Sequence, residues 1–129
     1  MEGRAEFKFL RIPDRKVRIV LNLIKGKKIE TAYNILKFTN KRASEIVRKL
    51  LRSAVSNISA KQGVKLENLY VSKAYVNQGP LYNKKLHPRA RLTRGIIKRK
   101  SCHATIVVND EEVKKVSEKK EKETKSGGS

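Results

Sequence analysis

The sequence is poor in the residues from which metal sites, disulfides and reactive centres are built. Its 129 residues include one cysteine, two histidines and no tryptophan, and aromatic residues make up 5%. A single cysteine excludes a disulfide framework and a zinc module with several cysteine ligands, and it is typical of a reducing compartment. Because the C-x-x-C and H-x-x-x-H spacings of metal ligands are also missing, we expect no metal site.

Long apolar runs and a secretion signal are missing as well. No segment approaches the ~18 consecutive apolar residues of a membrane-spanning helix, so we expect neither an integral membrane protein nor a membrane partner. The first residues, Met1 to Glu6, lack the apolar core of a secretory signal, and their two acids argue against an organellar transit peptide. The expected location is the cytoplasm.

No constellation of side chains predicts an enzyme. Cys102 and His103 are neighbours in the chain, and in a strand they would point to opposite faces, so they form a poor nucleophile–base pair. The simpler interpretation is a partly buried cysteine beside a histidine that donates a hydrogen bond to a phosphate or a backbone oxygen. Glycine-rich phosphate loops and the common RNA-binding signatures do not occur. We therefore expect no catalytic residue, no cofactor and no small-molecule substrate.

What the sequence contains in excess is positive charge. Lys and Arg number 32 against 12 Asp and Glu, a formal net charge of +20 at pH 7. So large an imbalance predicts a polyanionic partner. No acidic residue occurs between Glu67 and Asp110, and residues 83–100 alone carry eight Lys or Arg. Because solvated surfaces normally mix both signs, this stretch indicates contact with nucleic-acid phosphates.

Helical periodicity covers much of the first half of the chain. Behind Asp14, the expected N-cap, apolar residues recur at i, i+3, i+4 and i+7 until Gly26 ends the pattern. A second, shorter helix follows, and Thr39 or Asn40 is expected to cap a third helix that ends near Gly63. The apolar positions of the three helices are Val17, Val20, Leu21 and Ile24; Ile29, Ala32, Tyr33 and Leu36; and Ala43, Ile46, Val47, Leu50, Leu51, Ala54, Val55 and Ile58.

Three other segments predict strands. Phe7 and Phe9 alternate with a lysine, and residues 69–76 and 104–108 are rich in β-branched residues. An all-α domain would leave these segments without a role, whereas helices on one face of a sheet use all of them. We therefore predict an α+β fold in which three helices pack on a small three-stranded antiparallel sheet.

The stretch over residues 77–100, between the second and third strands, is too long for an ordinary turn. We predict that it forms a long protruding β-hairpin, that residues 1–109 form one domain, and that residues 110–129 form a disordered charged tail. An isolated ribbon is marginally stable in water, so the hairpin should become ordered where phosphates surround its basic side chains. These side chains are Lys84, Lys85, Arg89, Arg91, Arg94, Lys98, Arg99 and Lys100.

A DNA-binding protein is the alternative from a different functional class. The short turn at Lys25 to Lys28 between the first two helices could imitate a helix-turn-helix, as in an architectural or transcription factor. This interpretation leaves the strands and residues 77–100 without a role.

The order and spacing of several motifs resemble the bacterial large-subunit ribosomal protein L22 family over roughly residues 5–109. In the first half the motifs are Pro13-x-Arg15-Lys16-Val17-Arg18, Leu23-Ile24-x-Gly26-Lys27 and Ala32-x-x-Ile35-Leu36-x-x-Thr39-Asn40-Lys41. In the second half they are Leu50-Leu51-x-Ser53-Ala54, Gly79-Pro80, Pro88-Arg89-Ala90, Lys98-Arg99 and His103-x-Thr105-Ile106-Val107-Val108.

The resemblance implies a structural constituent of the large ribosomal subunit that supports its assembly, with a hairpin that extends through ribosomal RNA and lines the polypeptide exit tunnel. The implied partners are large-subunit ribosomal RNA, neighbouring large-subunit proteins and the nascent polypeptide. The implied RNA contacts of the body are Arg15, Lys16, Arg18, Lys27, Asn40 and Lys41, with Lys28 and Arg42 beside them. Those of the hairpin are Lys84, Lys85, Arg89, Lys98, Arg99 and His103, with Arg91, Arg94 and Lys100 beside them.

The chain departs from the family pattern around the hairpin tip. The tip that would face the tunnel comprises His87, Pro88, Arg89, Ala90, Arg91, Leu92, Thr93 and Arg94. The segment from Gly79 to Pro88 is one residue longer than is usual in the family, and Cys102 intervenes before His103.

Overall fold

The structure is a computed structural model, and it describes residues 2–62, 68–91 and 93–110. In these ranges the elements follow one another as β1 (Glu2–Leu10), α1 (Asp14–Ile24), α2 (Ile29–Phe38), α3 (Arg42–Gln62), β2 (Leu69–Pro88) and β3 (Arg94–Asp110). The predicted α+β class is confirmed. Asp110, predicted to be the first residue of the charged tail, is instead the last residue of β3 and pairs with Leu69, and the rest of that tail, residues 111–129, lies outside the described residues.

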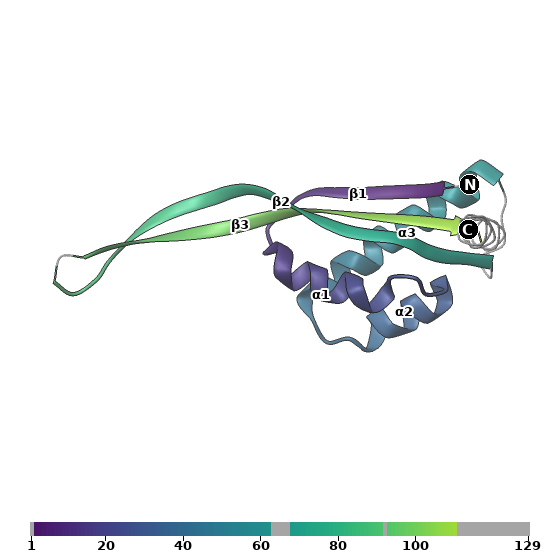
Figure 1. Cartoon of the computed structure of the whole chain (residues 1–129), viewed down its shortest axis with the longest axis horizontal. Helices are drawn as coiled ribbons and strands as arrows, with labels where there is room; N and C mark the ends of the chain where they lie inside the picture. Colours follow the sequence, from purple (N-terminus) through teal and green to yellow (C-terminus); the bar gives the residue numbers. More distant parts are fainter. Residues whose placement is uncertain (1, 63–67, 92, 111–129) are drawn as a thin grey trace, which may run out of the picture.

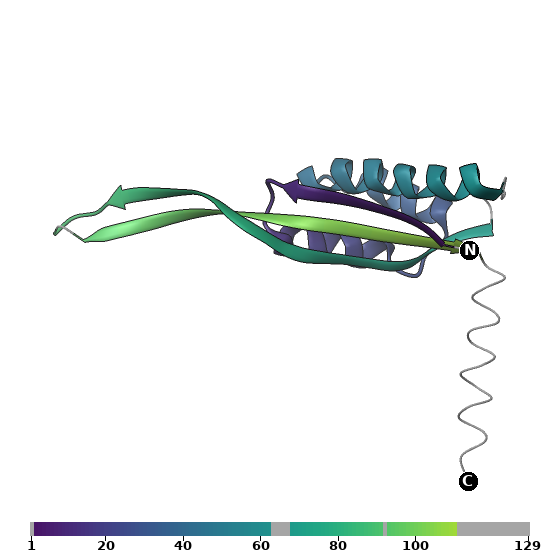
Figure 2. The ribbon, with the colours of Figure 1, turned by 90° about the horizontal axis from the view of Figure 1, so that it is seen from above.

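The described strands form one antiparallel sheet with the order β1-β3-β2. β3 is central, so the strand last in sequence joins the first strand to the second. The three helices lie on one face of this sheet, with α3 against β1 and α1 against β2 (Figures 1 and 2). The opposite face of the sheet carries polar side chains such as Arg4 and Glu6, which form an ion pair at 3.6 Å.

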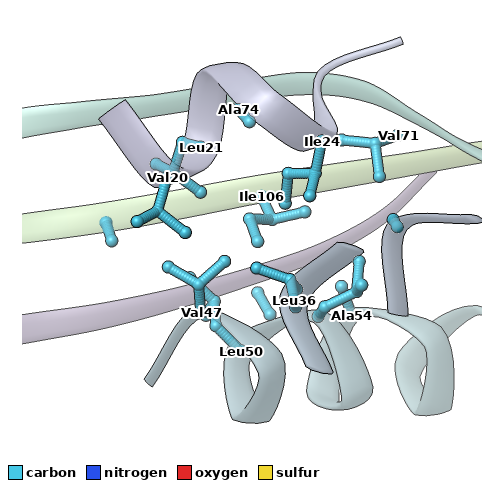
Figure 3. Packing of buried hydrophobic residues seen from close by; sticks show 14 of the residues in the cluster. Val20, Leu21, Ile24, Leu36, Val47, Leu50, Ala54, Val71, Ala74 and Ile106 are labelled. Atoms are coloured by element: carbon cyan, nitrogen blue, oxygen red, sulfur yellow. The ribbon is translucent and has the colours of Figure 1, made fainter. Parts of the chain in front are cut away.

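The core lies between the helices and the sheet, where the periodic apolar residues meet. Figure 3 shows side chains from all three helices pointing toward those of β2 and β3. The labelled residues are Val20, Leu21, Ile24, Leu36, Val47, Leu50, Ala54, Val71, Ala74 and Ile106, and all are buried. The helical faces predicted from the sequence are therefore confirmed, except that Tyr33 and Ile46 are only partly buried.

Two predicted helix caps are wrong. Pro13, not Asp14, is the N-cap of α1 and makes no side-chain cap hydrogen bond, and Asp14 instead accepts a hydrogen bond at 3.2 Å from Arg18 one turn later. Thr39 ends α2 rather than beginning α3, because its hydroxyl donates a 2.7 Å hydrogen bond back to the carbonyl of Ile35. α3 begins at Arg42, two residues after Asn40.

β2 and β3 continue well beyond the sheet as a two-stranded ribbon, which confirms the predicted long hairpin (Figure 1). β1 pairs with β3 as far as Cys102, so the part that stands free of the sheet runs from about Leu81 to Lys100. None of its described residues belongs to the buried core. We use the word hairpin for residues 81–100 from here on.

Two irregularities near the hairpin base each give β2 one residue more than β3. The first lies between the pairings of Gln78 and Leu81, and the second between those of Tyr82 and Lys84. Such bulges bend a strand and increase its twist. The second bulge is followed by regular pairing toward the tip, from Lys84 with Lys98 to Pro88 with Arg94.

The first bulge contains Gly79 and Pro80, two residue types that are uncommon inside a strand. The hydroxyl of Ser101 donates a 2.5 Å hydrogen bond to the carbonyl of Pro80, and a Cβ atom on Gly79 would lie 2.6 Å from that hydroxyl oxygen. Glycine is therefore required by the close approach of β3. Proline is tolerated because β2 is an edge strand and a bulge needs no ladder hydrogen bond at that position.

The hairpin closes in a compact turn. The N–H of Arg89 donates to the carbonyl of Thr93 at 2.9 Å, and the Thr93 hydroxyl donates to the carbonyl of Ala90 at 2.9 Å. Arg91 has φ +59°, in the left-handed region. Leu92, predicted to belong to the tunnel-facing tip, lies outside the described residues.

Candidate nucleic-acid interface

A groove of about 810 Å³ lies where the hairpin leaves the body. Four segments that are distant in sequence form its walls: the loop after β1, the first turns of α1, the start of α3 and the base of the hairpin. The lining residues are Arg11, Ile12, Pro13, Lys16, Ile19, Val20, Lys41, Arg42, Ala43, Tyr82, Lys98, Arg99 and Lys100. We call this feature the basic groove, because seven of its residues are Lys or Arg and none is acidic.

Local structure explains how these side chains come together. Lys16, Ile19 and Val20 are spaced i, i+3 and i+4 on α1 and therefore share a face, with Val20 buried and the other two exposed. At the hairpin base Tyr82 pairs directly with Arg99 across the ribbon, so their side chains lie on the same face of it.

The electrostatics of the groove favour a polyanion. Seven cations around one concavity repel one another, and no described acidic side chain lines the groove to offset them. Phosphate groups would remove this repulsion and release their own counterions, which is the main driving force for basic proteins on nucleic acid.

A second, smaller hollow of about 410 Å³ continues the basic surface around the start of α3. Lys41 and Arg42 line both hollows, and Asn40 lines the second. This hollow also contains Glu45 and is therefore less one-sided in charge than the basic groove. Phe38, 82% exposed, is also one of its lining residues.

Beyond the groove the predicted hairpin cations lie exposed along the ribbon. They are Lys84, Lys85, Arg89, Arg91 and Arg94. Lys84 pairs directly with Lys98, and like charges in that arrangement destabilise an antiparallel pair. The free ribbon is therefore electrostatically unfavourable, and anions beside it would stabilise it.

The remaining predicted body contacts lie outside the groove. Arg15 and Arg18 are exposed on α1, and the guanidinium of Arg18 is paired with Asp14. Lys27 and Lys28 lie in the turn between α1 and α2, which is tied to β2 by backbone hydrogen bonds, including one of 2.9 Å from the N–H of Val71 to the carbonyl of Lys27.

The structure thus brings six predicted residues into one groove: Lys16, Lys41, Arg42, Lys98, Arg99 and Lys100. Sequence reasoning missed Arg11, Ile19 and Tyr82. Tyr82 carries a signal that could have revealed it, since it is the one aromatic residue inside the acid-free stretch from 77 to 100. Ile19 carries none, because an exposed apolar residue on a helix is ordinary until its neighbours are known.

His103 is half-buried where β1 ends. Its Nδ1 accepts a 2.9 Å hydrogen bond from the backbone N–H of Phe9, and the predicted donation from the ring to an oxygen would have to come from Nε2. With Nδ1 as acceptor, the neutral ring carries its proton on Nε2.

Cys102 is fully buried, more deeply than the partly buried cysteine that the sequence led us to expect. Burial raises the pKa of its thiol, and the carboxylate of Asp14 raises it further. A buried, protonated thiol is a poor nucleophile. Within the described residues no group of three His, Cys, Asp or Glu side chains could hold a metal ion, and no helix has the length and apolarity to cross a membrane.

The helix pair that could imitate a helix-turn-helix is poorly suited to reading DNA. α2 would be the recognition helix, but it buries Ile29, Ala32 and Leu36 in the core. The charged side chains of α2 are one acid, Glu30, and one base, Lys37. A helix with no net charge gains little from entering a groove lined by phosphates.

Comparisons with known proteins agree with the resemblance seen in the motifs. The model of the family described as "Ribosomal protein L22p/L17e" matches residues 5–109. A protein named "Large ribosomal subunit protein uL22" from Thermoanaerobacter sp. (strain X514) is 47% identical over 112 residues, which cover 87% of this chain and 100% of the relative.

Two further relatives carry the same name. That of Acetivibrio thermocellus is 48% identical over 109 residues, covering 84% of this chain and 86% of its own. That of Macrococcus caseolyticus is 42% identical over 125 residues, covering 97% of this chain and 100% of its own. The chain therefore belongs to the ribosomal protein L22p/L17e family, and it is a structural, non-enzymatic constituent of the large ribosomal subunit in the cytoplasm.

Proposed function

We propose that this protein binds large-subunit ribosomal RNA along one basic surface, which begins at the basic groove and continues along the hairpin. The observation that carries the proposal is the groove itself, where cations from four distant segments converge without an acid. The hairpin extends this surface with Lys84, Lys85, Arg89 and Arg94, all exposed.

The hairpin passes through the RNA and lines the polypeptide exit tunnel with its tip. Support comes from its shape and its packing: it is long and narrow, and its described residues contribute nothing to the core (Figure 2). The compact turn around Ala90 is the part that would meet the nascent polypeptide. A segment without packing partners of its own becomes ordered only when other molecules surround it.

The body supports subunit assembly by holding separate RNA segments in fixed relation. The basic groove and the second hollow adjoin at Lys41 and Arg42, and Lys27 and Lys28 lie in a separate turn that lines neither hollow, so the body offers phosphates more than one place to bind. Exposed apolar side chains on the helices, Ile19, Leu23 and Phe38, are available to RNA or to neighbouring large-subunit proteins.

Salt-dependent RNA binding tests the proposal. The full chain is titrated with a transcript of large-subunit ribosomal RNA between 50 and 200 mM salt, beside the variant Lys84→Gln/Lys85→Gln. Each lost phosphate contact makes the slope of log affinity against log salt less steep by roughly 0.7–0.9. The slope of the variant should therefore be less steep than that of the unaltered chain by about 1.4–1.8. Lys49→Gln/Arg52→Gln, on the outer face of α3, is the charge-matched control.

The control variant should keep the slope of the unaltered chain. Equal losses in both variants would show that RNA responds to net charge alone and not to the hairpin. A slope near zero for the unaltered chain would contradict the proposal altogether, because phosphate contacts cannot form without releasing counterions.

A further inference from the structure

We propose that the basic groove holds a single unstacked nucleotide of RNA, with its base against Tyr82 and Ile19 and its phosphate among the surrounding cations. The inference rests on the proposed RNA binding and adds to it a defined site with a defined ligand: one nucleotide extruded from its helix.

The lining of the groove is the first argument. A site for phosphates alone needs only cations, yet Ile19 is 64% exposed and Tyr82 is 37% exposed among the seven Lys and Arg side chains. Beneath them the floor is apolar, formed by Ile12, Val20 and Ala43, which are at most 6% exposed. A nucleotide matches this pattern, because it joins a flat apolar base to a charged phosphate.

The shape of the groove is the second argument. Its volume of about 810 Å³ falls in the range of sites for small ligands, about 300–1,000 Å³. An RNA duplex is a convex rod that offers its phosphates along a surface, so it cannot enter such a concavity. Proteins that read unpaired RNA place splayed-out bases on aromatic rings or on Arg guanidinium planes.

The pairing of Tyr82 with Arg99 is the third argument. The two residues lie directly opposite on neighbouring strands, where Cβ atoms are about 4.5–5.5 Å apart, and both line the groove. An aromatic ring and a guanidinium side by side present two flat surfaces for one base. The same guanidinium can also pair with its phosphate.

Charge gives another segment of the same chain little reason to occupy the groove. Residues 111–129 contain six Lys and five Glu, so this nearly neutral segment offers no excess of anions to the seven cations. An acidic segment of a partner protein would satisfy the cations, but it would leave the exposed ring of Tyr82 without a matching flat surface.

Three tyrosine variants test the inference in the full chain. Tyr82→Ala removes the ring and Tyr82→Phe keeps it. Tyr75→Ala is the matched control, since Tyr75 is on the same strand, is 40% exposed and does not line the groove. Stacking on an aromatic ring is worth about 5- to 150-fold in affinity per base.

The expected result is that Tyr82→Ala weakens binding to a large-subunit ribosomal RNA transcript by at least about fivefold, with an unchanged salt slope because no charge is lost. Tyr82→Phe and Tyr75→Ala should stay within about twofold of the unaltered chain. With 5-iodouridine in the transcript, ultraviolet light should cross-link RNA to the peptide that contains Tyr82.

Each other outcome overturns the inference, and the outcomes separate it from the proposed function. If the unaltered chain binds the transcript but Tyr82→Ala behaves like Tyr75→Ala and no cross-link reaches Tyr82, the groove holds no base although RNA binding stands. If the chain does not bind the transcript, both proposals fail. If Tyr82→Ala leaves the affinity for the transcript unchanged, and poly-glutamate displaces the transcript from this variant and from the unaltered chain alike, the groove is a site for an acidic protein segment.

Discussion

The backbone N–H of Phe9 donates a 2.9 Å hydrogen bond to Nδ1 of His103, and the two rings meet edge to face with centroids 4.9 Å apart. Phe9 has φ +56°, in the left-handed region that bulky residues rarely adopt. It lies in the irregular pairing between Phe7 and Leu10, where β1 leaves the sheet. The contact with His103 therefore holds a strained residue at the point where the hairpin begins.

Removing this contact should weaken the fold modestly. His103→Leu keeps bulk but removes the acceptor, so we expect the free energy of unfolding to fall by about 0.5–1.5 kcal/mol, the usual net value of one hydrogen bond. Urea titration followed by circular dichroism measures it. Asn77→Ala is the control, because Asn77 lies opposite His103 on the neighbouring strand β2 and is exposed. An equal fall in the free energy of unfolding in the two variants would show that the contact between Phe9 and His103 adds no specific stability.

Gly3 should be intolerant of any side chain. A Cβ atom there would lie 2.6 Å from the carbonyl oxygen of Ala54 and 2.8 Å from Cβ of Ile58, both on α3. Because β1 and α3 would have to separate, we expect Gly3→Ala to cost about 1–3 kcal/mol. Gly95→Ala should cost less, since its nearest atoms, in Arg89 and His87, lie at 3.3 Å. A neutral Gly3→Ala would mean that β1 does not pack this closely on α3.

The body should fold without the hairpin. Replacing residues 81–100 by Asn-Gly, which favours a two-residue hairpin turn, should leave the free energy of unfolding nearly unchanged. Leu50→Ala, in the core, should instead cost about 2–5 kcal/mol. In the full chain without RNA, amide hydrogen exchange should be fast over 81–100 and slow in β3 near Ile106. Strong protection along the whole hairpin would show that it packs on the body.

Stability should fall at alkaline pH through Cys102. Because its pKa in the folded protein is raised above the ordinary value of 9.0, the unfolded chain loses the thiol proton first as pH rises. The stability that the protonated thiol contributes is therefore fully present below pH 9. It is lost as pH rises through the pKa of the folded protein, at no more than about 1.4 kcal/mol per pH unit.

Urea titrations at pH 8, 9 and 10 measure this loss. Cys102→Ala should flatten the dependence on pH whatever its effect on absolute stability. Tyr33→Phe should change it only at the upper end of this range, because the pKa of that phenol is also raised by burial and the unfolded chain loses this proton only around pH 10. An unaltered slope in Cys102→Ala would assign the alkaline loss to other groups.

Much of the fold was predictable because helical periodicity and charge are local properties of the sequence. The spacing of Val17, Val20, Leu21 and Ile24 alone indicates the buried face of α1, and all four residues are buried. The caps were not predictable, since Asp14 and Thr39 have the right chemistry for an N-cap. Their alternative partners, Arg18 and the carbonyl of Ile35, satisfy them one turn away instead.

The basic groove could be predicted only in part. Lysines and arginines of the acid-free stretch stand out as a group in the sequence, but their meeting with Arg11 and Lys41 depends on how β1, α3 and the hairpin base pack. The two bulges near Tyr82 are also non-local, because they are set by the register between β2 and β3. The place of Tyr82 beside Arg99 therefore follows from this register and not from any local pattern.

Cross-linking from the hairpin tip tests the proposed function most directly. The background Cys102→Ala removes the one native thiol, and Ala90→Cys places a new one in the exposed turn, with Ser56→Cys on α3 as the control. Each variant is labelled with a photo-activated cross-linker and assembled into large subunits that carry a stalled, radiolabelled nascent chain. We predict that position 90 cross-links to ribosomal RNA and to the nascent chain and that position 56 never reaches the nascent chain. Failure of position 90 to reach either molecule, or equal reaction of both positions with the nascent chain, would contradict the placement of the hairpin in the tunnel.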